Sequence, residues 1–341
     1  MKKIIAILIS LSLFALSCSN KASDTAADKG GDKIKIGLSL DDLRLERWQK
    51  DRDYFVKEAE SLGAEVIYIS SDGNATKQLA DIENLIAQNV DVLVVIANDG
   101  NSLSPAIMQA SQDGIPTLAY DRMINNCDIA HYVTFDLEKV GRMQAEGILE
   151  ITNKGRFYYL GGSPTDNNAQ YFRKGAMDAL KPYIDSGDIE LIGEQSTRDW
   201  LPDVALQIIE DMLTAQNNNV TAIVAANDAI GGAAVQALKA QGLAGKVPVS
   251  GQDADLAALQ RIARGEQAVT VYKPIHLIAK ECAKAAVALA KGEQALSNSS
   301  LNNGYKDVHT FYIEPIKVTK DNLDSTVIAD GWATKEDVYG N

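Results

Sequence analysis

The chain has 341 residues, of which 46% are hydrophobic and 23% are charged, and this balance is typical of a globular protein large enough for two lobes. Its formal net charge is −13, and its Lys and Arg residues form no basic stripe. Because phosphate groups are bound by clusters of basic residues, these features argue against a nucleic-acid partner.

The N-terminus has the pattern of an export signal. Lys2 and Lys3 precede an apolar run over residues 4–16. This run is too short to span a bilayer and is typical of the central part of a signal peptide. Residues 1–17 are therefore predicted to be a signal peptide, and the mature protein is expected outside the cytoplasm.

A cysteine follows this signal directly. The sequence Ala15-Leu16-Ser17-Cys18 resembles the processing site of bacterial lipoproteins, and the resemblance implies that Cys18 is acylated. Residues 18–32 are rich in Ser, Ala, Asp, Gly and Lys, which predicts a flexible tether behind a lipid anchor. The expected location is the periplasm or the outer face of the cytoplasmic membrane. The alternative is a cleaved, soluble exported protein.

The next part of the chain alternates between strand and helix patterns. Strands are expected at 34–40, 65–70, 91–97 and 117–120, and helices at 46–62, 76–88 and 104–112. The run DVLVVIA at 91–97 is continuously apolar, which is typical of a strand buried on both faces.

The same alternation of strands and helices begins again after residue 135. Helices are expected at 137–151, 168–180, 203–215, 230–241, 256–263 and 275–289. Strands are expected between them at 156–160, 190–193, 222–226, 247–250 and 268–272. Two successive sets of strand–helix units predict an α/β protein with two doubly wound parallel-sheet lobes.

Polar side chains follow most of the predicted strands. Asp121 and Arg122 come after one strand of the first lobe, and Asn227, Asp253 and Lys273 come after strands of the second. Each residue alone could cap the next helix. Because ligands bind at the carboxyl ends of parallel strands, the whole set predicts a binding site between the lobes.

Eight motifs in this order resemble the ribose-binding-like class of bacterial periplasmic sugar-binding proteins that serve ABC transporters, and within that class the D-xylose-binding members. The motifs are DDLRLERWQKDRD (41–53), LAYDRMIN (118–125), GGSPTDNNA (161–169), DWLP (199–202), ANDA (226–229), SGQDADLA (250–257), VTVYKP (269–274) and LNNGYKDV (301–308). The resemblance extends over nearly the whole chain beyond the tether.

The resemblance implies a type I periplasmic binding protein, with two doubly wound lobes joined by a three-segment hinge. The N-terminal lobe is expected to comprise 33–136 and 275–304, and the C-terminal lobe 137–274 and 305–341. The implied partners are D-xylose and the membrane permease of an ABC sugar transporter, and a monomer is expected.

By the same resemblance, nine residues are expected to contact the sugar: Arg47, Trp48, Asp121, Arg122, Asn168, Trp200, Asn227, Asp253 and Lys273. Their chemistry suits a pentose, whose apolar ring faces stack on indoles and whose hydroxyls need donors and acceptors around the ring. Two carboxylates against three cations leave such a site near neutral. As alternatives, Trp48 fits a core position and Asp121–Arg122 fits a surface ion pair.

Other classes of function fit less well. The three histidines have no metal-binding spacing, and no nucleophile elbow or phosphate-binding loop is present, so neither an enzyme, a metal site nor a cofactor is expected. A repressor would need a DNA-binding helix pair where the signal and tether lie. A sensory receptor, or a site for arabinose, ribose or glucose, stays open as an alternative. Cys127 and Cys282 could pair, although two buried thiols are favoured.

Overall fold

The computed structural model describes residues 33–340. The predicted signal peptide, Cys18 and the predicted tether lie outside the described residues. Among residues 33–340, no helix combines the length and the apolar character needed to cross a bilayer.

The first lobe is built on a seven-stranded sheet with the order β10-β11-β5-β4-β3-β1-β2. All neighbours in it are parallel except β10 and β11. The strands are β1 (Lys35–Leu40), β2 (Glu65–Ser70), β3 (Val92–Val95), β4 (Thr117–Tyr120), β5 (His131–Phe135), β10 (Ser299–Asn302) and β11 (Asp307–Ile313). Every residue of β3, β4 and β5 is buried, as expected for central parallel strands covered on both faces.

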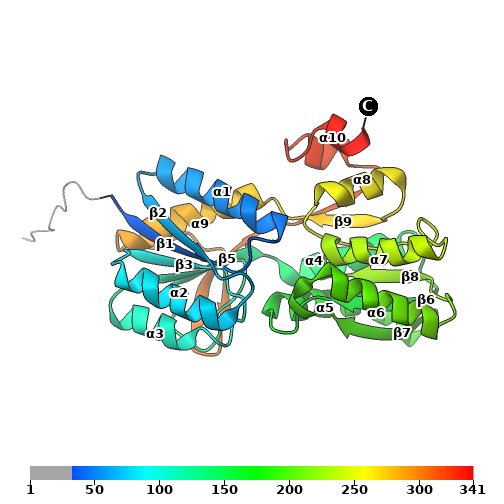
Figure 1. Ribbon diagram of the computed structural model, residues 1–341, viewed down its shortest axis with the longest axis horizontal. Helices are drawn as coiled ribbons and strands as arrows, with labels where there is room; N and C mark the ends of the chain where they lie inside the picture. Colours follow the sequence, from blue (N-terminus) through cyan, green and yellow to red (C-terminus); the bar gives the residue numbers. More distant parts are fainter. Residues whose placement is uncertain (1–32, 341) are drawn as a thin grey trace, which may run out of the picture. The chain divides into compact units, whose positions relative to one another are not determined.

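Helices cover both faces of this sheet (Figure 1). On one face α1 (Glu46–Ser61) packs against α9 (Ile275–Ala290), and the other face carries α2 (Ala75–Ala87) and α3 (Ser104–Gln112). The two faces hold separate hydrophobic clusters, with Cys282 in one and Cys127 in the other. Both cysteines are free and buried, in agreement with the favoured prediction.

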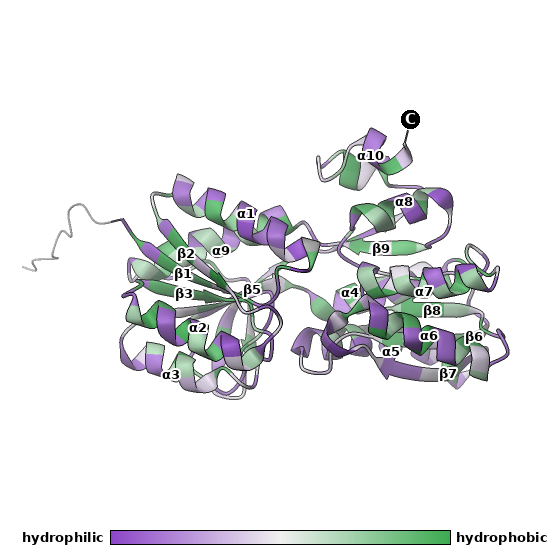
Figure 2. Ribbon diagram, in the orientation of Figure 1, coloured by the Kyte–Doolittle hydropathy of each residue, from purple (hydrophilic) through white to green (hydrophobic). Residues whose placement is uncertain are grey.

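The second lobe contains two smaller sheets. The parallel strands β7 (Ile189–Ser196), β6 (Gly155–Gly161) and β8 (Ala222–Ala225) form one, and the antiparallel pair β9 (Val269–Tyr272) and β12 (Ile316–Thr319) forms the other. Side chains alternate across β6, so that Phe157 and Tyr159 face one hydrophobic cluster and Tyr158 and Leu160 face another. Figure 2 shows apolar residues gathered along the strands, while the outer helices are mixed.

The helices of this lobe again lie on two faces. One layer has α4 (Leu137–Leu149) against α5 (Asn167–Asp185), and the other has α6 (Pro202–Ala215) against α7 (Asp228–Ala240). A short 3-10 turn, η1 (Arg198–Trp200), precedes α6. The C-terminal part of the lobe holds α8 (Leu256–Arg264), the π-helical turn η2 (Asp324–Ile328) and α10 (Lys335–Tyr339).

The chain crosses between the lobes three times. The crossings lie at Asp136 between β5 and α4, at 273–274 between β9 and α9, and at 314–315 between β11 and β12. Two of these short segments contain proline, Pro274 and Pro315, which restricts the backbone there. The α/β fold with two doubly wound lobes and a three-segment hinge is confirmed.

The third crossing corrects the predicted lobe boundary. Residues 305–313 were expected in the second lobe, but β11 pairs in parallel with β5 from Thr310 to Ile313 and so completes the first sheet. Val308 is fully buried in the first lobe's core. The crossing therefore follows Ile313, because the backbone groups of β11 find their partners on the edge of β5.

The observed strands also differ from the predicted ones in two respects. The strand expected at 247–250 is reduced to two isolated bridges, Ile223 with Val249 and Ala244 with Val247, because Pro248 has no N–H to donate to a ladder. The segment nevertheless joins the two sheets, since Ile223 donates to the Pro248 carbonyl and Ala268 donates to the Val249 carbonyl. Strands β5, β10, β11 and β12 were not predicted.

Candidate functional site

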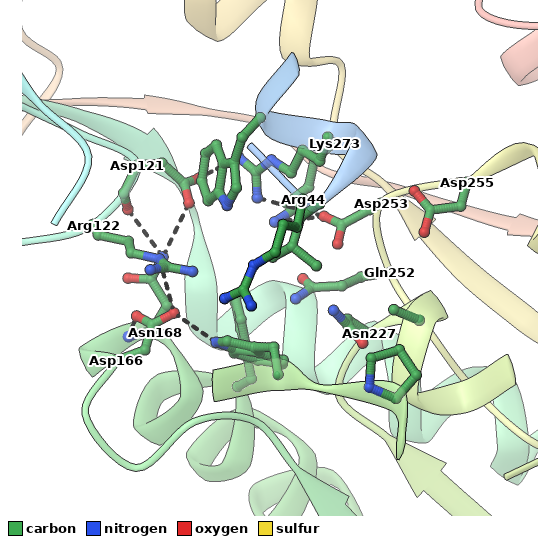
Figure 3. A pocket seen from close by; sticks show the side chains of 17 residues that line it. Arg44, Asp121, Arg122, Asp166, Asn168, Asn227, Gln252, Asp253, Asp255 and Lys273 are labelled. Carbon is green, nitrogen blue, oxygen red and sulfur yellow. Dashed lines mark hydrogen bonds and ion pairs between the residues drawn. The ribbon is translucent and has the colours of Figure 1, made fainter. Parts of the chain in front are cut away.

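A cavity of about 230 Å³ opens where residues of both lobes meet at the carboxyl ends of their strands (Figure 3). This volume is at the small end for ligand sites and suits a molecule of monosaccharide size. All nine residues predicted from the sequence line the cavity: Arg47, Trp48, Asp121, Arg122, Asn168, Trp200, Asn227, Asp253 and Lys273. The remaining lining residues are Arg44, Leu45, Asp166, Phe172, Pro202, Ala229, Gln252 and Asp255.

Local structure explains why these side chains converge. Arg47 and Trp48 lie in the first turn of α1, and Asp121 and Arg122 follow β4 directly. From the second lobe, Asn168 lies in the first turn of α5. In parallel sheets the strand ends and the following helix starts share one edge, so residues distant in sequence meet there.

The remaining contributors come from the second lobe and the hinge. Asn227 is the N-cap of α7, and its side-chain oxygen accepts a hydrogen bond from the Ile230 N–H at 2.9 Å. The capping interpretation of such residues is therefore correct for Asn227, although the residue also lines the cavity. Lys273 directly follows β9 at the second crossing.

Arg47 connects three carboxylates. Its Nη2 lies 2.7 Å from Asp121 Oδ1, its Nε lies 3.2 Å from Asp51 Oδ2, and its Nη1 lies 3.5 Å from Asp253 Oδ1. Burial alone would lower the pKa of Arg47, but the three carboxylates outweigh it and raise the pKa well above its usual value. Arg47 therefore stays charged and ties α1 of the first lobe to the Asp253 loop of the second.

Lys273 is a second cation near Asp121 and Asp253, two of the carboxylates that contact Arg47. Burial would raise the pKa of Asp121, but Arg47 and Lys273 outweigh this effect and lower it, so Asp121 is an ionised acceptor. Lys273 Nζ lies 2.8 Å from Asp253 Oδ1, and Lys273 is only 1% exposed. A buried ammonium needs such a partner, which explains why Lys273 and Asp253 occur together.

A second connection between the lobes centres on Asp166, a residue that the sequence analysis did not select. Its Oδ2 accepts a hydrogen bond from Trp200 Nε1 at 3.1 Å and lies 3.0 Å from Arg122 Nε (Figure 3). Arg122 Nη1 also reaches Asp41 Oδ2 at 2.6 Å. Asp166 stands inside the motif GGSPTDNNA and caps α5, and capping alone gave no reason to prefer it.

The two tryptophans have different surroundings. Trp48 is 2% exposed and belongs to the core, and the guanidinium carbons of Arg47 and Arg122 lie 4.3 and 5.2 Å from its ring centroid. Trp200 is 5% exposed and meets Phe172 edge to face at 6.4 Å. Trp48 therefore lines the cavity and is part of the core as well, as the core interpretation predicted, and its contact with a sugar stays a prediction.

Two polar atoms in the cavity wall lack a protein partner. Among the described residues, Asn168 Oδ1 and Gln252 Oε1 are buried and have no hydrogen-bond partner. The nitrogen of the Asn168 side-chain amide does have a partner, since Nδ2 donates a hydrogen bond to the Asp121 carbonyl at 3.0 Å. Buried acceptors of this kind are costly unless a ligand or water satisfies them, which indicates a polar ligand.

The charges of the lining residues balance. By formal charge, the four cationic side chains of the wall (Arg44, Arg47, Arg122 and Lys273) are matched by four carboxylates (Asp121, Asp166, Asp253 and Asp255). A neutral, hydroxyl-rich ligand suits such a wall better than an ion. Within residues 33–340, no three His, Cys, Asp or Glu residues gather in a way that could hold a metal ion.

The two-lobed fold, its three crossings and the polar cavity between the lobes define a binding protein of the periplasmic type. The chain belongs to this family, since the sequence model of the periplasmic binding protein domain matches residues 36–294. The predicted resemblance is confirmed, and binding rather than catalysis is the function of the family, as predicted.

The chain is also similar to individual proteins of this family. The chain is 54% identical to the D-xylose-binding periplasmic protein of Haemophilus influenzae over 306 residues, which covers 90% of this chain and 92% of the relative. It is also 54% identical to the protein of the same name from Escherichia coli, with coverage of 88% and 91%. Among solved structures, a carbohydrate transporter solute-binding protein from Chloroflexus aurantiacus in complex with D-glucose matches with a TM-score of 0.84 at 30% identity, covering 90% of this chain and 98% of that one.

Proposed function

We propose that this protein binds D-xylose between its two lobes and delivers the sugar to the membrane permease of an ABC transporter. The observation that carries the proposal is that all nine residues expected to contact the sugar line one cavity. The 54% identity to two D-xylose-binding periplasmic proteins supports the choice of sugar.

The wall of the cavity supplies the groups that a pentose needs. Asp121 and Asp253 accept hydrogen bonds from hydroxyls, while Arg122 and Lys273 donate to them. Asn168 Oδ1, which has no protein partner among the described residues, is a further acceptor. Trp48 and Trp200, one from each lobe, offer apolar surface to the C–H faces of the ring.

Hinge closure is the proposed mechanism. Arg47–Asp253 and Arg122–Asp166 are ion pairs between residues of different lobes, and the Asn168 amide donates to the Asp121 carbonyl across the same boundary. A sugar that contacts both lobes adds to these links and favours the closed state. The permease would then recognise the closed form.

The setting of the protein is part of the proposal. The signal at residues 1–17 would export the protein, and acylation of Cys18 would anchor it through a tether that extends to residue 32. The two lobes would then act as a monomer in the periplasm or at the outer face of the cytoplasmic membrane. Two acyl chains anchor a protein stably, whereas one binds only weakly.

Titration calorimetry with D-xylose, D-ribose, L-arabinose and D-glucose tests the ligand. We expect D-xylose to bind at least about tenfold more tightly than D-ribose, a difference of about 1.4 kcal/mol, since one buried hydrogen-bonding group left without a partner accounts for that much. Glucose is included because the Chloroflexus relative was solved with it. Tighter binding of any other sugar of the panel would refute the proposal.

A further inference from the structure

The third tryptophan of the sequence, Trp332, lies outside the cavity but contacts the loop that forms one wall of it. Trp332 follows η2 in the C-terminal segment, and its ring lies 5.7 Å from that of Tyr272 within the core of the second lobe. Its indole Nε1 donates a hydrogen bond to the Ala254 carbonyl at 2.7 Å. Ala254 is the residue directly after Asp253.

The loop that Trp332 holds has an unusual backbone. Asp253 and Ala254 adopt φ values of 96° and 54°, in the left-handed region that residues other than glycine rarely occupy. Such a conformation persists only where its surroundings hold it. Besides the Trp332 hydrogen bond, the Ala254 N–H donates to Thr270 Oγ1 at 3.2 Å. This conformation places the Asp253 carboxylate against Lys273 and Arg47.

Trp332 is also contacted from the other lobe. Lys50 lies in α1, one turn after Arg47, and its Nζ is 4.2 Å from the Trp332 ring centroid. This is cation–π geometry. Neither Lys50 nor Trp332 lines the cavity, so the contact links the lobes at a separate place.

The same C-terminal segment also contacts residues on both sides of the second crossing. Asp330 Oδ2 accepts a hydrogen bond from the Tyr272 hydroxyl at 2.5 Å and lies 3.9 Å from His276 Nε2 in the first turn of α9. His276 in turn meets the ring of Tyr54 of α1 at 6.1 Å. The segment 330–332 is thus in contact with the binding loop, with the elements on both sides of the second crossing and with α1.

We propose that Trp332 is a positioning residue that couples lobe closure to the sugar site. In the closed state Lys50 packs on the indole, and the indole N–H holds the left-handed turn that presents Asp253 to the ligand. The inference rests on the proposed sugar-binding function. When the lobes separate, Lys50 moves away with α1 and this support of the closed state is lost.

Four variants separate the two contacts. Trp332→Phe keeps an aromatic ring for Lys50 but removes the N–H donor, and Lys50→Met keeps the aliphatic chain but removes the charge. Trp332→Leu removes both contacts, and Trp332→Leu with Lys50→Met completes a double-mutant cycle. Lys57→Met, which removes an exposed charge from the same helix, is the matched control.

The readout is the dissociation rate of D-xylose by stopped-flow tryptophan fluorescence, together with the unfolding midpoint of the sugar-free protein. We expect Lys50→Met and Trp332→Phe each to raise the dissociation rate by about threefold or more, because Lys50→Met loses a contact between the lobes and Trp332→Phe loses the hydrogen bond that holds the Asp253 turn. The association rate, the sugar-free midpoint and the Lys57→Met control should stay near the parent values. In the Trp332→Leu background, Lys50→Met should have no further effect on dissociation.

Parent-like dissociation in both Lys50→Met and Trp332→Phe would overturn the inference. So would full additivity in the cycle, or binding losses that merely follow lower sugar-free stability. If the parent binds a different sugar of the panel, the proposed ligand fails while the inference is tested with that sugar. The two failures are therefore distinguishable.

Discussion

Gly162 and Trp200 lie so close together that a Cβ atom on Gly162 would be 1.9 Å from Cη2 of the indole. Gly162 follows β6, and Trp200 ends the 3-10 turn η1 with a left-handed backbone at φ 57°. The indole therefore occupies the space that the missing side chain leaves. This contact sets the position of Trp200 in the cavity wall.

We predict that Gly162→Ala weakens D-xylose binding by about tenfold or more, because the methyl group forces the indole out of its place, and overpacking of this kind costs about 1–3 kcal/mol. Calorimetry measures the affinity. Gly232→Ala in α7 is the control, since the three atoms nearest to its Cβ would all belong to the Arg261 guanidinium group, the closest at 2.9 Å and none of them in the cavity wall. Parent-like affinity in Gly162→Ala would show that the indole position does not matter for binding.

Trp200→Ala distinguishes a ligand contact from a core residue. If Trp200 stacks on the sugar, binding should weaken by about 2 kcal/mol or more, as at other buried aromatic anchors, while the sugar-free protein loses little stability. A core role predicts the reverse, with a loss of about 3–5 kcal/mol in the free energy of unfolding. Calorimetry and denaturant melts on the one variant decide between them.

Asp166→Asn tests the connection between Arg122 and Trp200. The neutral amide cannot form the cross-lobe ion pair, so we expect binding to weaken by about 1–3 kcal/mol, a typical loss for a hydrogen bond that involves a charged group. Asp211→Asn, at an exposed position of α6, is the charge-matched control. An unchanged affinity in Asp166→Asn would mean that the pair does not support the liganded state.

Asp51 predicts a pH dependence of stability. Burial raises its pKa from 3.8 to about 6, although Arg47 and a hydrogen bond from the Tyr120 hydroxyl oppose the rise. Because the folded protein then binds more protons than the unfolded chain between pH 4 and 6, the contribution of Asp51 to stability falls as the pH rises through that window, by about 1.4 kcal/mol for each unit of pKa difference.

The test compares the parent with Asp51→Asn by denaturant unfolding at several pH values from 4 to 8. As the pH falls, the free energy of unfolding of the parent should rise relative to that of the variant. A difference between the two proteins that is constant over this range, or one that shrinks for the parent in acid, would contradict the assigned pKa.

The anchor is tested at Cys18, which lies outside the described residues. We predict that the parent stays in the membrane fraction of cells until detergent is added, because diacylation binds stably. Cys18→Ala should release the protein or leave it unprocessed. Detergent-dependent membrane retention that persists in the variant would show that acylation at Cys18 is not the anchor.

Much of the fold and of the site was predictable from local sequence patterns. The apolar run of β3 and the amphipathic pattern of α1 require only a buried surface to pack against, whatever its detailed structure. Periodicity alone therefore indicates both elements. The polar residues after β4 could be assigned to the site because parallel strands present their carboxyl ends, where ligands bind, at one edge of the sheet. This rule, together with the motif resemblance, placed nine residues in one cavity.

Tertiary structure decided the rest. The lobe that receives β11 depends on its pairing with β5, which lies about 175 residues earlier in the chain, and a strand pattern does not name its partner. Asp166 has the local pattern of a helix cap, and only the folded chain brings Arg122 and Trp200 to its carboxylate. The contacts of Trp332 with Lys50 and Ala254 likewise exist only once the two lobes and the C-terminal segment have packed, because long-range contacts depend on which surfaces the whole fold brings together.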